Sequence, residues 1–320
     1  MATEGSKEDE ERKSRGSLRN ILIDTVLNLE ELDVNLYRSS NHWKPMVNAN
    51  AVFGGQVIGQ ALVAAGKTVD QKMHAHSLHA YFVRPGKNIR PILYQVQRVR
   101  DGKSYATRSV SAIQQGNAIL TMQASFNREE YSEFKHQYTM PVVPPPEQLL
   151  SAREVTEKYL IEFPEPVQDY IRKRRTAEVP MEIKPLNPTA VLPAVLLQKA
   201  LQLENTDEPK RVVWMKALGN IGDDGLLNRC VAAYFSDMIL AMTSHLARPK
   251  VIVSMVTSLD HSMWFHAPFR IDEWMLYECE SPRSGAGRGF NLGRLWRRDG
   301  TLAISVAQEC VLRSAGSSKL

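Results

Sequence analysis

The sequence lacks the features that mark membrane-spanning, secreted and disulfide-stabilised proteins. No apolar run in the chain approaches the roughly 20 residues needed to cross a bilayer. The opening stretch, MATEGSKEDEERKSRG, is too charged for a secretory signal, so we expect the chain to stay out of the secretory pathway. The three cysteines, Cys230, Cys279 and Cys310, are too widely spaced for a disulfide framework or a C-x-x-C zinc site. A reducing compartment is therefore expected.

Motifs of several enzyme classes are missing as well. The sequence contains no G-x-S-x-G string, which argues against a serine nucleophile of the α/β-hydrolase type. It contains no H-E-x-x-H string, which argues against that class of zinc enzyme. The glycines of GAGRG at 285–289 do not have G-x-G-x-x-G spacing, and a strand-like segment follows them. We expect a hairpin turn there rather than a phosphate-binding loop.

The composition is that of a globular protein. A chain of 320 residues with 43% hydrophobic content is long enough for two ordinary domains with real cores. The net charge of +5 suits nucleic acid and a phosphate-bearing small molecule equally, so charge alone does not choose a partner. The last three residues, Ser318, Lys319 and Leu320, form the signal that the peroxisomal import receptor reads. We therefore expect a peroxisomal matrix protein.

The first half of the chain reads as a helix followed by an antiparallel meander. Residues 1–17 are polar and predict a disordered tail, and the apolar spacing from Ser17 to Val26 predicts a short helix. LYR at 36–38 predicts a strand, and the small residues of 53–69 predict a buried helix packed closely along a sheet. Alternating segments broken at Asp101-Gly102 and Gln115-Gly116 then predict antiparallel strands.

Residues 129–178 lose this periodicity. They include three consecutive prolines at 144–146 and predict a long connection with some helix around 147–161. The basic run RKRR at 172–175 is interpreted as a solvated face.

The second half repeats the first in order. A strand at 212–218 and a helix at 226–247 precede four strand segments at 256–269, 274–281, 289–300 and 301–313. A shift of 183 residues places Pro85 on Pro268 and Tyr94 on Tyr277 without a gap. The sequence therefore predicts two α+β units at 18–128 and 179–315, with a tail at 316–320. Chance similarity between two such domains is the alternative.

A resemblance to a known family is carried by FGGQVIGQAL, HSLHAYFVRPG, SDMILA, SLDHSMWFHAPF, WMLYECES and QECVLR. These segments resemble the acyl-coenzyme A thioesterase II family, the bacterial TesB type and its peroxisomal relatives, from about residue 18 to 314. The resemblance implies a double hotdog fold, in which two long helices are each wrapped by their own sheet and the sheets join side by side. It also implies hydrolysis of acyl-CoA to a free acid and coenzyme A. We expect no cofactor.

The resemblance assigns catalysis to Asp237 in SDM, Ser258 in SLDHSMWFH and Gln308 in AQECV. Hydrolysis without a covalent intermediate needs a group that orients and deprotonates water, and donors for the developing oxyanion. In that scheme Asp237 is the base or charge partner, and the hydroxyl and the amide orient the water.

Histidines offer an alternative base. His76, which opens HSLHAYF, is our alternative catalytic assignment. In a regular strand His74 and His76 share one face and His79 takes the other, so joint metal binding would need a bulge. His261 is separated from its polar neighbours by the same alternation. These histidines are interpreted as ordinary strand residues, and no metal site is expected.

The duplicated chain is expected to have one working site. The shift of 183 puts Gly54 opposite Asp237, and Ser77 and Gln123 fall near the serine and glutamine of the second repeat. The first repeat would then keep two partners and lack the acid.

The glycines at 54 and 55 suggest a site at the junction of the halves. A helix N-terminus has unpaired amides and a favourable dipole, so the amides of Gly54, Gly55 and Gln56 could hold the substrate's carbonyl oxygen. The alternative is that both glycines only allow close packing of helix and sheet.

Two other function classes stay open. A hotdog enoyl-CoA hydratase would carry a D-x-N-P-x-H type motif, but Asn187-Pro188 lacks its acid and histidine. A non-catalytic module that binds acyl-CoA or RNA would explain the charge, although no run of exposed aromatic residues interleaves with the basic ones. The expected partners are the acyl-CoA substrate and the import receptor, without nucleic acid or membrane insertion. Homo-oligomerisation is left open.

Overall fold

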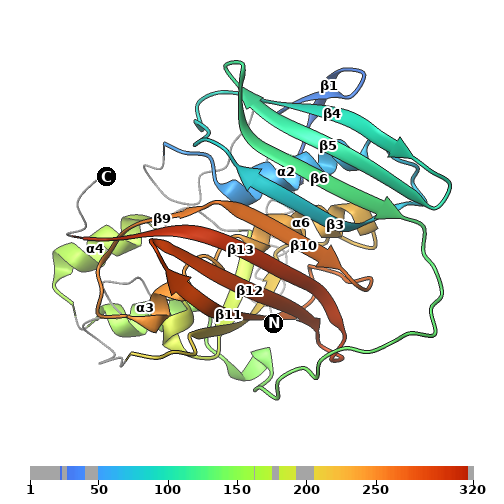
Figure 1. Ribbon diagram of the computed structural model, residues 1–320. Helices are drawn as coiled ribbons and strands as arrows, with labels where there is room; N and C mark the ends of the chain where they lie inside the picture. The colour runs from blue at the N-terminus through green and yellow to red at the C-terminus, as the bar shows by residue number, and fades with distance from the viewer. Residues whose placement is uncertain are drawn as a thin grey trace, which may run out of the picture.

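A single curved antiparallel sheet of 13 strands wraps around two central helices in the computed structural model (Figure 1). The structure describes residues 22–23, 27–39, 50–161, 163–174, 180–191 and 205–315. The strands of the first half are β1 (Glu30–Asp33), β2 (Leu36–Ser39), β3 (His74–Phe82), β4 (Ile92–Asp101), β5 (Tyr105–Gln114) and β6 (Asn117–Asn127). Those of the second half are β7 (Met181–Pro185), β8 (Lys210–Ala217), β9 (Val253–Ser258), β10 (Asp260–Phe265), β11 (Met275–Gly285), β12 (Arg288–Arg297) and β13 (Leu302–Ser314).

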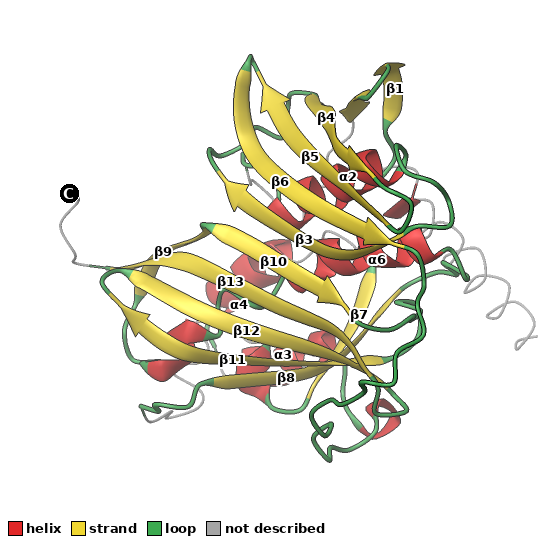
Figure 2. Ribbon diagram, turned by 45° about the vertical axis from the view of Figure 1, so that its right-hand side comes forward, coloured by secondary structure: helices red, strands yellow, loops and turns green. Residues whose placement is uncertain are grey.

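Each half of the sheet holds one helix against its concave face. Figure 2 shows α2 (Gly54–Gly66) and α6 (Gly225–Ser236) lying together behind the strands. The remaining described helices are α3 (Ala152–Leu160), α4 (Glu165–Arg174) and the 3₁₀ turns η2 (Pro146–Gln148), η3 (Pro188–Ala190) and η4 (Ser244–Ala247). Buried alanines and aliphatic residues of α2 and α6 share one core with the inner face of both half-sheets. The expected pair of helix-plus-sheet units is confirmed.

The two half-sheets join edge to edge through β3 and β10. The strand order is β1-β2-β4-β5-β6-β3-β10-β13-β12-β11-β8-β7, and β9 pairs with β13. At the junction Tyr81 pairs with Asp260, and Ser77 pairs with Trp264. A shift of 183 residues turns one pair into the other (264 − 81 and 260 − 77), as a twofold axis through the junction requires. The junction also protects two strands that would otherwise be open sheet edges.

The two helices approach unusually closely, and glycine makes this contact geometrically feasible. A Cβ atom on Gly55 would overlap the backbone carbonyl oxygen of Tyr234, and one on Gly59 would lie 3.0 Å from that of Cys230. The N-terminal end of α2 therefore lies beside the C-terminal end of α6. The prediction of a small-residue helix in close packing at 53–69 is confirmed, although its contact is with the other helix as well as with the sheet.

Two predicted elements have different boundaries in the structure. The helix predicted at 226–247 ends at Ser236, and the chain from Asp237 onward forms turns and η4. The strand predicted at 256–269 is divided at Leu259 into β9 and β10, because β9 pairs only with β13 while β10 also pairs with β3. Within 147–161 the expected helix is α3, capped by Ser151 and Glu154 in a reciprocal capping box. The helix α4 was not predicted.

Several expectations fall outside the described residues. These include the polar tail at 1–17, most of the helix expected from Ser17 to Val26, and the terminal tripeptide 318–320. The predicted turns at Gln115-Gly116 and within GAGRG are confirmed, with Gln115, Gly116, Ala286 and Gly287 all at positive φ. Among the described helices, none is long and apolar enough to cross a membrane.

Candidate active site

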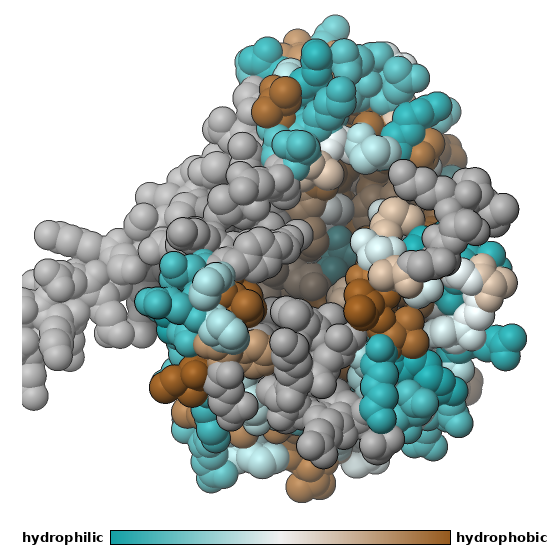
Figure 3. All heavy atoms as spheres, turned by 90° about the vertical axis from the view of Figure 1, so that its left-hand side faces the viewer, coloured by the Kyte–Doolittle hydropathy of each residue, from teal (hydrophilic) through white to brown (hydrophobic). Residues whose placement is uncertain are grey.

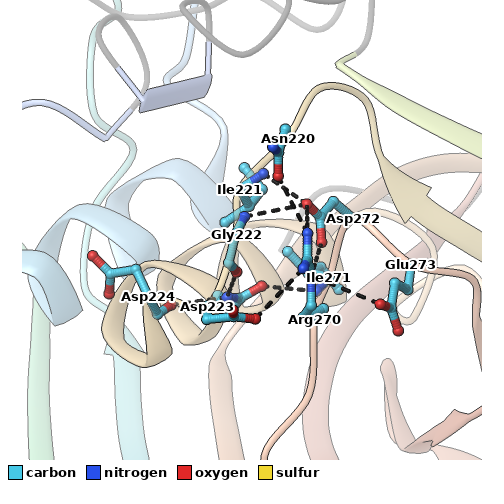
Figure 4. A network of polar contacts seen from close by, with 10 residues as sticks. Asn220, Ile221, Gly222, Asp223, Asp224, Arg270, Ile271, Asp272 and Glu273 are labelled. Carbon is cyan, nitrogen blue, oxygen red and sulfur yellow. Dashed lines mark hydrogen bonds and ion pairs between the residues drawn. The ribbon is translucent and has the colours of Figure 1, made fainter.

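The position of α6 is fixed at its N-terminus by a network of polar contacts (Figure 4). Asp224 caps the helix by accepting a hydrogen bond from the amide of Leu227 at 2.9 Å. Asp272 accepts from the amide of Ile221 at 2.7 Å, and Arg270 donates to the same carboxylate at 3.0 and 3.1 Å. Because this end of the helix is held firmly, its other end presents Asp237 at a defined place.

Asp237 is the residue at which α6 ends, and it faces the start of α2. A Cβ atom on Gly54 would lie 2.9 Å from Oδ2 of Asp237, and the amide of Gly55 donates to the Asp237 carboxylate. The N-terminal dipole of α2 favours a negative charge at this position. Tertiary contact with α2 thus explains why the chain turns at Asp237 instead of continuing the helix.

Asp237, Ser258 and Gln308 come together from three separate elements. Gln308 on β13 donates from Nε2 to Oδ1 of Asp237 at 2.7 Å and to Oγ of Ser258 at 2.7 Å. Ser258, the last residue of β9, lies with its Oγ 3.4 Å from Oδ1 of Asp237. Ser258 is placed opposite Cys310 by the β9–β13 pairing, two residues beyond Gln308. The three side chains named from the sequence therefore form one hydrogen-bonded cluster.

The environment raises the pKa of the Asp237 carboxyl to about 6, chiefly because burial disfavours its charged form. Hydrogen bonds from Gln308, from the Gly55 amide and from Ser258 act in the opposite direction and limit the shift. The side chain is only 8% exposed. A carboxylate with a pKa near 6 is ionised at neutral pH and is a stronger base than an ordinary aspartate, which suits proton abstraction from water.

A fourth polar group at the cluster was not identified from the sequence. His261 on β10 is fully buried, and its Nε2 lies 2.8 Å from Oγ of Ser236, the last residue of α6. The ring also interacts with the side chain of Gln308. Burial lowers the pKa of His261 to about 4, so the ring is neutral at physiological pH. Strand alternation placed His261 on the opposite face from its polar neighbours, and the fold shows that this is the inner face, beside Gln308.

His76 lies elsewhere. It sits at a bulge in β3 and its Nε2 is 2.8 Å from Oγ of Ser125. Ser125 alternates along β6 with the core residues Ala124 and Phe126, so this pair lies on the outer face of the sheet. The structure does not bring His76 to Asp237. Among the described residues, no group of three or more histidine, cysteine or acidic side chains could hold a metal ion.

Two of the three amides proposed to bind the oxyanion already make hydrogen bonds within the protein. The Gly55 amide contacts Asp237, and the Gln56 amide donates to the carbonyl oxygen of Phe53 at 3.1 Å. Gly54, at the first position of α2, is the remaining candidate of the three.

The equivalence of Gly54 with Asp237 is wrong. Gly54 begins α2, whereas Asp237 follows the end of α6, and its counterpart after α2 is Lys67. The shift of 183 fails here because the connection after α6 (237–252) is longer than the one after α2 (67–73). Gly54 is a neighbour of Asp237 across the helix pair instead.

The two partners assigned to the first repeat also differ from expectation. The junction register makes Asp260 the counterpart of Ser77 (260 − 77 = 183), so Ser258 corresponds to Ala75.

The counterpart of Gln308 follows from the strand pairings. In the first repeat Gln123 pairs with His79. In the second repeat the counterpart of His79 is Ser262, which pairs with Ala307, so Gln123 corresponds to Ala307. The counterpart of Gln308 is therefore Ala124, the neighbour of Gln123. The first repeat therefore has Lys67, Ala75 and Ala124 at these positions, and these side chains cannot form the hydrogen-bonded cluster of the second repeat.

A surface pocket of about 450 Å³ lies away from this cluster. It is lined by Asp223, Arg229, Arg270 and Trp274 among others, beside the N-terminal end of α6. The length of the helix separates it from Asp237. A second feature is visible in Figure 3, where the face on the β9 side of the molecule is hollowed at its centre and partly lined by apolar residues.

Comparison with known proteins gives matches along both repeats. Residues 42–127 match the family described as "Acyl-CoA thioesterase N-terminal domain", and residues 173–312 match "Acyl-CoA thioesterase C-terminal domain". The sequence is 48% identical to human "Acyl-coenzyme A thioesterase 8", covering 93% of this chain and 91% of that protein. It is 33% identical to "Acyl-CoA thioesterase 2" of Haemophilus influenzae, covering 90% and 96%.

Solved structures support the same family and fold. An acyl-CoA thioesterase II from Mycobacterium marinum superposes with a TM-score of 0.68 at 34% identity, covering 93% of this chain and all of that one. A hot dog fold protein from Alicyclobacillus acidocaldarius has the same TM-score at 16% identity, covering 91% and 98%, which supports the fold alone. The double hotdog architecture is confirmed.

Proposed function

Since this chain belongs to the acyl-CoA thioesterase family and is an acyl-CoA thioester hydrolase, we propose that Asp237, Ser258 and Gln308 direct a water molecule onto the thioester carbonyl. The observation that carries the proposal is the convergence of the three side chains through two 2.7 Å hydrogen bonds from a single amide nitrogen.

The mechanism follows from what each group can donate or accept. Asp237, with its raised pKa, takes a proton from the water as the oxygen attacks the carbonyl carbon. Ser258 has a hydroxyl that can hold the water, while Gln308 fixes both the hydroxyl and the carboxylate. Collapse of the tetrahedral intermediate breaks the carbon–sulfur bond, releases the free acid, and transfers the proton to the coenzyme A thiolate.

The helix α2 supports this chemistry from the other repeat. We assign the Gly55 amide to the Asp237 carboxylate, which it stabilises as an anion. The Gly54 amide is left as the proposed donor to the oxyanion, at the helix N-terminus where unpaired donors and the dipole favour negative charge. One reaction centre thus draws on both halves of the chain.

The location of the enzyme is proposed from its last three residues. Ser318-Lys319-Leu320 would bind the peroxisomal import receptor, and the reaction would then take place in the peroxisomal matrix. Fatty acyl-CoA thioesters are the substrates we propose there.

The reaction is tested by following thiol release from a series of fatty acyl-CoA esters, and its route by a single turnover in ¹⁸O-labelled water. Direct attack places the label in the released acid and leaves Asp237 unlabelled. An acyl adduct on Asp237 or Ser258 in an acid-quenched sample, or the label in the Asp237 side chain, would overturn the water mechanism. An absence of thiol release with every ester would overturn the activity itself.

A further inference from the structure

The cluster works only if the Gln308 amide keeps one orientation. Its Nε2 atom donates both to Asp237 and to Ser258, at 2.7 Å each. If the amide turned over, its carbonyl oxygen would face the carboxylate, two acceptors would meet, and both hydrogen bonds would be lost. Gln308 is fully buried, so water cannot repair such a loss easily.

The sheet places a second buried polar side chain beside that amide. Ser262 on β10 pairs with Ala307 on β13, so the antiparallel register puts His261 across from Gln308, and both residues are fully buried. Oε1 of Gln308 and Nδ1 of His261 are both buried, and neither has a hydrogen-bond partner of good geometry among the described residues. The other ring nitrogen of His261 is already taken by Ser236 at 2.8 Å. The interaction between the ring and the Gln308 side chain also favours a proton on the ring, as expected for a histidine N–H facing a carbonyl oxygen.

We propose that His261 is a positioning residue that donates from Nδ1–H to Oε1 of Gln308 and thereby holds the amide in its catalytic orientation. The inference rests on the proposed role of Gln308. It implies a directed chain of donors, in which Ser236 donates to His261, His261 to Gln308, and Gln308 to Asp237 and Ser258.

The tautomer of His261 follows from this chain. If Nε2 carried the proton, Nδ1 would present a lone pair to Oε1 of Gln308, which is repulsive. With the proton on Nδ1, the Ser236 hydroxyl donates to Nε2 at 2.8 Å in preference to the Ala233 carbonyl oxygen at 3.1 Å. Nδ1 of His261 and Oε1 of Gln308 then have each other as partners. The low pKa of His261 keeps the ring neutral at pH 7, so one tautomer can persist.

The first test separates positioning from folding by activity. His261→Leu should lower kcat by about 10- to 100-fold, the range found for groups that orient metal ligands, and leave KM nearly unchanged. His261→Asn should restore at least about tenfold of that loss, because its side-chain amide can donate where Nδ1–H did. The control is His266→Leu, on the outer face just after the same strand, where the ring hydrogen-bonds Ser305 at 2.9 Å; its kcat should be that of the wild type.

A double-mutant cycle then asks whether His261 acts through Gln308. In a Gln308→Ala background, His261→Leu should cause no further loss of kcat. A full additional loss in that background, or a wild-type kcat for His261→Leu alone, would overturn the proposal. Failure of Asp237→Asn to reduce turnover would instead overturn the catalytic set, while the cycle would still report the coupling of His261 to Gln308.

The wild-type enzyme provides a test that does not depend on folding of any variant. Long-range ¹H–¹⁵N spectra of histidine-labelled protein at pH 7 should show His261 protonated at Nδ1 and unprotonated at Nε2. The signal is assigned by its disappearance in His261→Asn or, if that variant does not fold, by its pH-independence expected from the low pKa. The opposite tautomer would overturn the proposal.

Discussion

Replacing Asp237 by asparagine should stop catalysis and also change how the stability of the fold depends on pH. Burial raises the pKa of this carboxyl from 3.8 to about 6, so the folded state holds the proton more tightly than the unfolded chain does. The resulting stabilisation is fully present below the unfolded pKa and is lost as the pH rises through the folded pKa. At neutral pH the wild-type protein therefore bears the cost of a buried carboxylate.

Asparagine cannot ionise, so a comparison of the wild type with Asp237→Asn isolates the effect of ionising the buried carboxyl group. With pKa values of 3.8 and about 6, the free energy of unfolding of the wild type should fall by about 1.4 kcal/mol relative to Asp237→Asn between pH 5 and pH 8. The whole shift corresponds to about 3 kcal/mol. The NH2 group of the new asparagine can also face the Gly55 N–H. Two donors then meet, which lowers the free energy of unfolding at every pH. The difference between two pH values is therefore the informative quantity.

Urea unfolding at pH 5, 6, 7 and 8 measures it, with Asp207→Asn as the control because the Asp207 side chain is 92% exposed. Thiol release by Asp237→Asn should fall by about 100- to 10,000-fold, and kcat/KM of the wild type should rise with pH through about 6 as the base ionises. Equal pH dependence of unfolding in the wild type and Asp237→Asn would refute the reasoning from a buried carboxylate, whatever the activity.

Three further outcomes are expected. Ser258→Ala should lower kcat by about tenfold or more while Ser258→Thr keeps the hydroxyl and most of the activity; a fully active Ser258→Ala together with an inactive His76→Ala would restore the histidine alternative. Gly55→Ala should cost about 1–3 kcal/mol of unfolding free energy because its methyl group overlaps the Tyr234 carbonyl oxygen, whereas Gly285→Ala, whose methyl group would lie 3.8 Å from the Arg283 side chain, should cost little. Deletion of residues 318–320 should leave the purified enzyme active and move a tagged form to the cytosol; import of the truncated form into peroxisomes would indicate another signal.

Local patterns in the sequence were enough for most of the strands and for the hairpins, because alternation and turn residues act over short distances. The short strands β1 and β7 were not predicted. Local patterns could not give the end of α6, since the apolar spacing continues from Met238 to Ala247 and the turn at Asp237 depends on contact with α2. A comparison of the repeats without gaps also concealed the longer connection after α6.

The candidate site also combines residues found from sequence motifs with a residue found only from tertiary contacts. The resemblance supplied Asp237, Ser258 and Gln308, which the fold brings into one cluster. The role proposed for His261 depends on its contact with Ser236 and its place opposite Gln308, residues 25 and 47 positions away along the chain (261 − 236 and 308 − 261), and no local pattern reports such neighbours.

The equivalent ends of α2 and α6 are followed by Lys67 and Asp237. In a pair of identical chains, any residue at one end of the helix pair would appear at the other end too. A buried acid would then lower the stability of the assembly twice. Joining the two copies in one polypeptide removes that constraint. One end can carry the cost of a buried carboxylate while the other is free to change for solubility or packing, and mutations at the two ends can be selected independently.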